Sequence, residues 1–173
     1  MFEVKQTRSN EVNIRIFFYN FIIVLFIFFQ SSFSFSKDFL SIRIIDGDTI
    51  VINKKKIRLH GIDAPEKNQI CKNIEGNPYY CGIISTKILK KIIGKSKVNC
   101  LKKGKDRYSR IIGVCFINKV NINQKMVKLG WALAYRKYSK DYVIDEKQAQ
   151  ENKLGLWSGK FTKPWIWRKN IKK

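Results

Sequence analysis

Between residues 39 and 62, short runs of β-branched residues alternate with tight turn signals, and this pattern constrains the fold more than any other. Residues 41–45 and 49–52 flank an Asp46-Gly47 pair, and a lysine-rich turn separates the second run from residues 57–62. An Asp-Gly pair between β-branched runs is a strong hairpin signal. The sequence therefore predicts three consecutive strands joined by two tight turns.

The chain beyond these strands mixes helical and strand patterns. Its predicted elements are, in order, a loop over residues 63–78, a helix over 81–93, a hairpin over 98–117 with its turn at 102–107, and helices over 123–129 and 141–154. A glycine follows each of the last two helices, as is common at helix ends. With 173 residues the chain suits one domain, so we expect an α+β domain built on a small β-barrel.

The N-terminal segment has the pattern of an export signal. Three basic residues precede an apolar run over residues 16–29, and a serine-rich stretch follows. The run is shorter than the roughly 20 apolar residues that a membrane-spanning helix needs. We expect cleavage before Lys37, with residues 32–34 as a second possible site. An uncleaved N-terminal anchor is the alternative, and either one carries the rest of the chain out of the cytoplasm.

Four cysteines lie after the expected cleavage site: Cys71, Cys81, Cys100 and Cys115. An even number of cysteines in a small exported domain predicts two disulfides. Three pairings are possible, and Cys100 and Cys115 could face each other across the second predicted hairpin, which would leave Cys71 to pair with Cys81. A zinc site with four cysteines is the alternative, but the spacing contains no C-x2-C pair.

The chain is intensely basic, with 35 Lys and Arg residues against 13 Asp and Glu. Loss of residues 1–36 would lower the formal charge only from +22 to +21. Such a charge attracts polyanions, and nucleic acid is the commonest polyanion of this kind. Anionic membranes and polysaccharides would also bind, and a bias toward lysine codons would give the same charge without any partner.

Acidic residues, although scarce, gather around the predicted strands. Asp46 and Asp48 occupy the first turn, while Asp63 and Glu66 flank the proline after the third strand. If the strands pair, these acids converge at one end of a sheet, where they would repel one another unless a cation lay between them. Oxygen ligands select a hard ion, Ca²⁺ or Mg²⁺, and such an ion can polarise a phosphodiester.

Two arginines complete this pattern. Arg58 lies on the strand that leads to Asp63, and Arg110 lies in the second hairpin. A guanidinium matches the geometry of a phosphate and can stabilise the extra charge of a five-coordinate transition state. The set of acids and arginines therefore points to phosphodiester hydrolysis.

In their order and spacing these residues resemble the staphylococcal nuclease (thermonuclease) family. The matching motifs are I-D-G-D-T at 45–49, R-L-H-G-I-D-A-P-E at 58–66, D-R-Y-S-R at 106–110, M-V-K-L-G-W-A at 126–132 and G-L-W at 155–157. The resemblance implies an OB-fold barrel of five strands with three helices. It also implies a Ca²⁺-dependent endonuclease that cleaves DNA and RNA and leaves 3′-phosphate ends.

The resemblance assigns roles to the acidic residues. Asp48 and Asp63 match the family's calcium-binding aspartates, and Ala64 stands where the family offers a backbone carbonyl to the ion. The family often has threonine at that position, so any contribution from its hydroxyl is absent here. Glu66 matches the acid that acts as general base or orients the attacking water, and Asp46 matches a supporting acid.

The same resemblance extends to the substrate-binding residues. Arg58 and Arg110 match the family's two phosphate-contacting arginines. Tyr108 matches a tyrosine at the nucleotide site, and Ser109 replaces the glycine that the family usually has after it. Tyr135 matches a second substrate-binding tyrosine, although the alignment there needs a gap and Tyr138 is the alternative.

The sequence thus predicts three regions and two contrasting functions. Residues 1–36 form the export signal or anchor, residues 37–160 the nuclease-like domain, and residues 161–173 a basic aromatic tail that packs on the domain or covers nucleic acid. We expect a secreted or periplasmic monomer without a protein partner. The alternative function is an inactive OB-fold module that binds nucleic acid at the cell surface.

Overall fold

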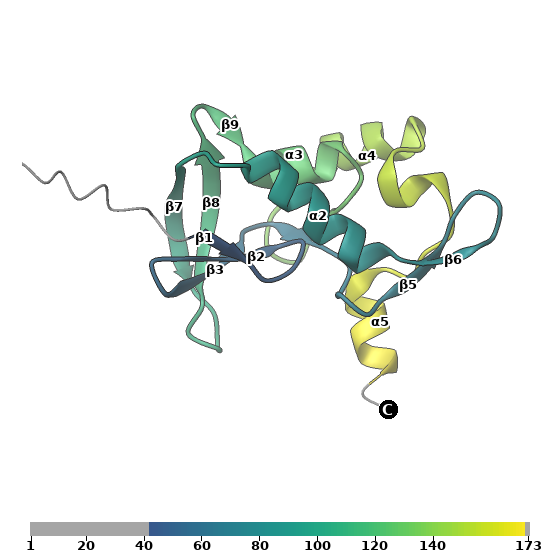
Figure 1. The fold of residues 1–173 in the computed structure, drawn as a ribbon, viewed down its shortest axis with the longest axis horizontal. Helices are drawn as coiled ribbons and strands as arrows, with labels where there is room; N and C mark the ends of the chain where they lie inside the picture. Colours follow the sequence, from purple (N-terminus) through teal and green to yellow (C-terminus); the bar gives the residue numbers. More distant parts are fainter. Residues whose placement is uncertain (1–41, 172–173) are drawn as a thin grey trace, which may run out of the picture. The chain divides into compact units, whose positions relative to one another are not determined.

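The computed structural model describes residues 42–171, which lie in a single compact unit (Figure 1). The predicted export signal at residues 1–36 lies outside the described residues. Within residues 42–171, no helix combines the length and the apolar character needed to cross a membrane.

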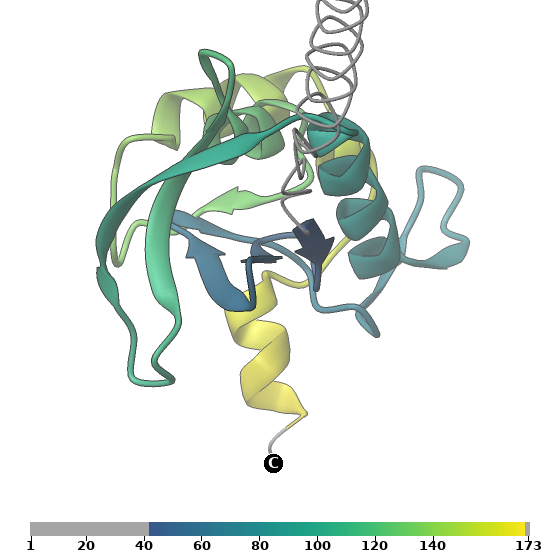
Figure 2. The same ribbon diagram turned by 60° about the vertical axis from the view of Figure 1, so that its left-hand side comes forward.

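The main sheet contains six strands in the order β1-β2-β3-β8-β7, with β9 pairing to β8. Only β3 and β8 run parallel, and the other neighbours are antiparallel. Figure 2 shows the long, curved β7–β8 hairpin. The strand bounds are β1 Ile42–Ile44, β2 Thr49–Ile52, β3 Lys55–Leu59, β7 Val98–Lys105, β8 Ile111–Ile117 and β9 Val120–Asn121.

The three strands predicted over residues 39–62 are confirmed as β1, β2 and β3. Asp46 and Gly47 lie in the turn between β1 and β2, as the Asp-Gly signal predicted. Asn53 and Lys54 connect β2 to β3 with φ angles of 48° and 65°. Positive φ at two successive residues is the conformation that a two-residue hairpin turn requires.

Two small antiparallel sheets accompany the main one. One pairs β4 (Ile62–Asp63) with β10 (Leu133–Ala134), and the other pairs β5 (Ile70–Lys72) with β6 (Pro78–Tyr80). The predicted α+β class is confirmed, whereas the pairings among the described strands leave the main sheet open and do not close it into a barrel.

The described residues contain four α-helices, and three of them are the helices predicted from the sequence. The fourth, α5, lies in the C-terminal tail, where no helix was predicted. The bounds are α2 Cys81–Ile93, α3 Ile122–Lys128, α4 Val143–Glu151 and α5 Pro164–Asn170, with a 3-10 turn, η2, at Gly155–Ser158.

Two sequence predictions need correction. The predicted loop over residues 63–78 contains the end of β4, all of β5 and the first residue of β6, and Cys71 pairs with Tyr79 in the β5–β6 ladder. The turn predicted at 102–107 lies instead at 106–110, because β7 continues to Lys105 through an irregularity between Lys102 and Gly104.

Both predicted disulfides are present and each fixes a hairpin. Cys71 bonds Cys81 at the end of the β5–β6 hairpin, and Cys100 bonds Cys115 directly across the β7–β8 ladder. The described residues contain no free cysteine, so the alternative of a zinc site with four cysteines is wrong for this structure.

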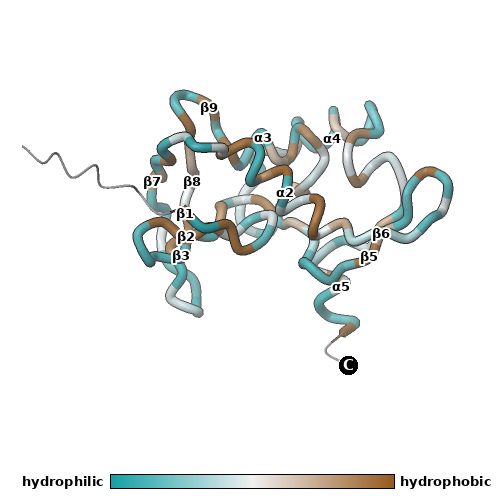
Figure 3. The backbone as a smooth tube through the Cα atoms, in the orientation of Figure 1, coloured by the Kyte–Doolittle hydropathy of each residue, from teal (hydrophilic) through white to brown (hydrophobic). Residues whose placement is uncertain are grey.

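Two hydrophobic clusters support the domain. The larger one joins the main sheet to α2 and α3, with Ile50, Leu59 and Leu89 almost fully buried. The smaller one surrounds the Cys71–Cys81 disulfide and receives aromatic rings from the segment that leads into α5. Figure 3 shows hydrophobic segments along the strands and α2, and a hydrophilic turn between β2 and β3.

Candidate active site

A pair of buried aspartates meets one arginine where β2, β3 and β4 come together. Asp48, just before β2, is 2% exposed, and Asp63, at the end of β4, is 0% exposed. Arg58 on β3 donates hydrogen bonds to Oδ1 of Asp48 and, at 2.6 Å, to Oδ1 of Asp63. The β2–β3 register places Thr49 opposite Arg58 and so brings Asp48 beside it. We call Asp48 and Asp63 the acid pair.

The turn that carries Asp48 is held by short-range hydrogen bonds. The Asp48 amide donates to Oδ1 of Asp46 at 3.0 Å, and the Thr49 hydroxyl donates to Oδ1 of Asp48 at 3.0 Å. The Ala64 amide donates to Oδ2 of Asp48 at 2.9 Å, which ties the acid pair together through the backbone. Gly47 allows this close approach, because a Cβ there would lie 2.0 Å from Oγ of Ser85 on α2.

Burial and mutual repulsion disfavour the charged forms of these acids. Burial, together with the nearby charge of Asp48, raises the pKa of Asp46 to about 7. The same two causes raise the pKa of Asp63, although Arg168 and Arg58 act in the opposite direction. This part of the molecule therefore favours additional positive charge.

Glu66 lies close to the acid pair and contacts an arginine that sequence reasoning missed. Arg168, on α5 in the tail, donates from Nη1 to Oε1 of Glu66 at 2.9 Å and from Nη2 to Oδ2 of Asp63 at 2.8 Å. Burial alone would lower the pKa of Arg168, but the hydrogen bonds and charges of Asp63 and Glu66 outweigh it and raise that pKa. The only sequence signal for this contact was the basic and aromatic character of the tail.

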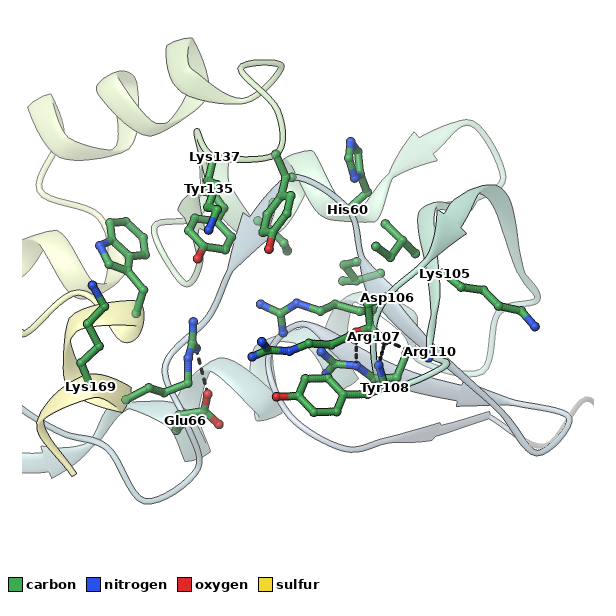
Figure 4. A pocket seen from close by; sticks show the side chains of 18 residues that line it. His60, Glu66, Lys105, Asp106, Arg107, Tyr108, Arg110, Tyr135, Lys137 and Lys169 are labelled. Carbon is green, nitrogen blue, oxygen red and sulfur yellow. Dashed lines mark hydrogen bonds and ion pairs between the residues drawn. The ribbon is translucent and has the colours of Figure 1, made fainter. Parts of the chain in front are cut away.

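A cavity of about 690 Å³ opens over these groups. Arg58, Glu66 and Arg168 line it, together with residues of the turn at 106–110. In Figure 4 the carboxyl group of Glu66 and the ring of Tyr108 project toward the same opening. The acid pair does not line the cavity, but Arg58 and Arg168, which donate hydrogen bonds to it, do.

The turn at 106–110 is organised by Asp106, which sequence reasoning did not single out. Its Oδ1 accepts the amides of Tyr108 and Arg110 at 2.9 and 3.0 Å, and its Oδ2 accepts Nε of Arg110 at 2.7 Å. The guanidinium of Arg110 lies 5.6 Å from the centre of the Tyr108 ring. Ser109 adopts a φ of 60°, a left-handed conformation that explains why glycine suits this position.

Three aromatic rings, those of Tyr135, Tyr138 and Trp165, also line the cavity. Tyr135 stacks on Trp165 of α5 with ring centres 5.3 Å apart, and the Tyr138 ring approaches it edge-on with ring centres 5.0 Å apart. The structure therefore places both candidate tyrosines at the site and adds Trp165, which sequence reasoning left in an undefined tail.

The predicted site residues fall into two groups. Arg58, Glu66, Arg110, Tyr108 and Tyr135 line one cavity, while Asp46, Asp48, Asp63 and Ala64 form the layer behind Arg58. Arg110 forms its ion pair with Asp106 and not with the acid pair.

The oxygen atoms behind Arg58 are candidate ligands for a hard cation beside the cavity. No group of three or more His, Cys, Asp or Glu side chains in residues 42–171 converges closely enough to hold a metal. The acid pair nevertheless presents two carboxylates to a common cation, the Arg58 guanidinium. Two carboxylates suit Ca²⁺ chemically, and backbone, water and substrate oxygens would supply the remaining ligands of the six to eight it usually takes.

A family of known proteins matches the part of the chain that carries most of this site. The family described as staphylococcal nuclease homologue matches residues 56–159, which include Arg58, Glu66, Arg110 and Tyr135. A Haemophilus influenzae protein described as an uncharacterized endonuclease is 38% identical over 139 residues, which are 76% of this chain and 72% of the relative.

Two further relatives have similar coverage. An Escherichia coli protein described as an uncharacterized endonuclease is 38% identical over 135 residues, 73% of this chain and 82% of the relative. A micrococcal nuclease of Shigella flexneri is 34% identical over 149 residues, 76% of this chain and 80% of the relative. The matches therefore span most of the described domain.

Proposed function

We propose that this chain, which belongs to the staphylococcal nuclease family, is a calcium-dependent endonuclease that hydrolyses phosphodiester bonds of DNA and RNA. One observation carries the proposal: a single cavity joins the guanidiniums of Arg58 and Arg110 to the carboxylate of Glu66, directly above the buried acid pair. A site of this kind can bind a phosphate group beside a general base and beside carboxylates that suit a hard cation.

Each group has a defined task in this proposal. Arg58 and Arg110 bind the scissile phosphate and stabilise the charge that grows on its oxygens. Glu66 takes a proton from the attacking water or orients it for in-line attack on phosphorus. When bound to Asp48, Asp63 and the Ala64 carbonyl, Ca²⁺ would polarise a phosphoryl oxygen and help to position the water. Asp46 supports the turn that carries Asp48.

Substrate binding draws on the aromatic and basic surface around the phosphate. Tyr108 and Tyr135 line the cavity, where their rings can pack against a sugar or base. The formal charge of +22 supplies affinity for nucleic acid that does not depend on sequence. Neither feature distinguishes ribose from deoxyribose, in keeping with action on both DNA and RNA.

Family membership supports several finer parts of the proposal. These are an OB-fold arrangement of the main sheet, products with 3′-phosphate ends, and action as a monomer. The two disulfides favour an oxidising compartment, so we propose a periplasmic or secreted enzyme that residues 1–36 direct to export. The nuclease-like domain then covers residues 37–160 and is followed by the tail.

Digestion of plasmid DNA and of RNA tests the proposal directly. We expect cleavage with Ca²⁺, none with chelator, and products that end in 3′-phosphate. Glu66→Gln should lower kcat about 100-fold or more, because a positioned general base contributes about 100- to 10,000-fold, while DNA binding stays near that of the unaltered protein. Binding without any cleavage would identify the alternative, an inactive nucleic-acid-binding module.

A further inference from the structure

The chain is anchored to the domain shortly before helix α5, which carries Arg168 into the site. Residues 160 and 72 form a two-way backbone bridge, with Lys72 N to Lys160 O at 2.8 Å and Lys160 N to Lys72 O at 2.9 Å. Nε2 of Gln69, a fully buried residue, donates to the Thr162 carbonyl at 2.7 Å. The start of the tail is therefore fixed against the β5–β6 hairpin.

Aromatic packing extends this anchor into α5 itself. Pro164 at the first turn of the helix is buried. Trp165 packs against the cluster around the Cys71–Cys81 disulfide and stacks on Tyr135. Because α5 is a single short helix, these contacts fix the position of Arg168 one turn further along.

Arg168 joins two carboxylates that have different tasks in the proposed reaction. Its two terminal nitrogens each reach one carboxylate, Nη1 to Glu66 and Nη2 to Asp63. Among residues 42–171 no other side chain donates a hydrogen bond to the Glu66 carboxylate, and that side chain is 34% exposed. Without Arg168, Glu66 would be free to adopt other rotamers.

The backbone of Glu66 is already fixed, so its side chain is what remains to be oriented. The Glu66 carbonyl accepts the Gln69 amide at 2.8 Å. It also lies against Gly82 of α2, where a Cβ would come within 1.8 Å of the carbonyl oxygen. A fixed backbone and a single side-chain partner make Arg168 the group that decides where the carboxylate points.

We propose that Arg168 is a positioning residue of the active site, which holds the Glu66 carboxylate at a fixed place relative to Asp63 and the scissile phosphate. The proposal rests on the proposed nuclease function. Catalysis depends strongly on such placement, because a displacement of about 1 Å can cost roughly 100-fold in rate. A forked guanidinium is suited to this task, since it can bond two carboxylates at once.

Steady-state kinetics of full-length Arg168→Met with a single-stranded oligonucleotide and Ca²⁺ test the proposal. We expect kcat to fall about 10- to 100-fold with KM changed less than about threefold, because the substrate contacts stay in place. Arg168→Lys should recover part of this loss, since one ammonium provides charge but cannot bridge both carboxylates in the same way. Arg43→Met is the matched control, because Arg43 is exposed on β1 and does not line the cavity.

Calcium affinity, measured by calorimetry without substrate, gives a readout apart from activity. Loss of the positive charge beside Asp63 should leave Ca²⁺ binding unchanged or tighten it by up to about tenfold. If Arg168 is a positioning residue, its loss should therefore lower kcat without lowering the affinity for Ca²⁺. Thermal unfolding should change by no more than a few degrees, because Asp63 keeps its ion pair with Arg58.

Three outcomes would overturn the inference. They are unchanged kcat in Arg168→Met, full kcat in Arg168→Lys, and a loss of kcat that follows an equal loss of Ca²⁺ affinity and thermal stability. If Arg168→Met does not fold, Arg168→Lys decides, with a loss of about threefold or more expected. An inactive unaltered protein would refute the proposed function itself, whereas an active one with fully active Arg168 variants would refute only the role of Arg168.

Discussion

Arg58 and Arg110 line the same cavity but are held in opposite ways. Arg58 lies on a central strand and bonds two carboxylates that other strands bring to it, and its side chain is 19% exposed. Arg110 lies at the end of a hairpin turn, and its carboxylate partner is four residues away in sequence. The first arginine depends on the tertiary fold, and the second depends on one local turn.

Because of this difference, substitutions of the two arginines should affect the stability of the fold to different degrees. Removing Arg58 would leave two buried carboxylates without their shared partner, which is costly to the folded state. Removing Arg110 would leave Asp106 with two backbone amide donors and a side chain that is 16% exposed, so the lost ion pair should contribute less to stability. Both changes should damage catalysis, but only the first should damage the fold.

The largest expected effect is the loss of activity in Arg110→Met. We expect kcat to fall about 100- to 1000-fold, because one donor to the transition-state charge disappears. The free energy of unfolding should change by less than about 1 kcal/mol. Oligonucleotide cleavage and urea denaturation measure the two quantities, with Lys103→Met, an exposed change on the same hairpin, as the control. Turnover near that of the unaltered protein would remove Arg110 from the mechanism.

The next effect is the loss of stability in Arg58→Met. The free energy of unfolding should fall by about 3 kcal/mol or more in chelator, because breaking a buried ion pair from one side costs about 3 to 5 kcal/mol. Adding Asp63→Asn should restore part of this loss, since it removes one of the uncompensated charges. Urea denaturation of the two single variants and the double variant measures this coupling. Additive losses would show that Arg58 and Asp63 do not stabilise each other.

Sequence reasoning succeeded where local signals agreed with the tertiary structure. The Asp46-Gly47 turn and the β-branched runs identified β1 to β3, and helical spacing identified α2 with its observed bounds. The sequence indicated that Cys100 and Cys115 could face each other across a hairpin, and they pair directly in the β7–β8 ladder. In each case the pattern and the packing lie within a short stretch of chain.

Sequence reasoning failed where a contact joins distant segments. Arg168 is separated from Asp63 by 105 residues, and nothing in the tail's composition specifies that contact. The turn at 106–110 was misplaced because Lys102 to Lys105 has the composition of a loop, yet it pairs with β8 as strand. Tertiary pairing overrides a weak local preference in such a segment.

The smallest expected effect concerns Ser109, which tests how far the local turn limits Arg110. A residue other than glycine at a φ of 60° carries a steric cost. Ser109→Gly should therefore raise the free energy of unfolding by about 1 kcal/mol or less, since the greater freedom of glycine in the unfolded chain offsets part of the gain. Lys54→Gly, at a φ of 65° in the β2–β3 turn, is a matched control outside the cavity.

The kinetics of these two variants decide whether Arg110 depends on its turn alone. If the turn sets the position of Arg110, Ser109→Gly should change kcat by a few-fold, while Lys54→Gly changes stability but not kcat. Because Asp106 bonds the amides on both sides of Ser109, a relaxed residue 109 can shift Arg110 without breaking either bond. Equal kcat values for both variants and the unaltered protein would mean that the Asp106–Arg110 pair fixes the guanidinium whatever the conformation of residue 109.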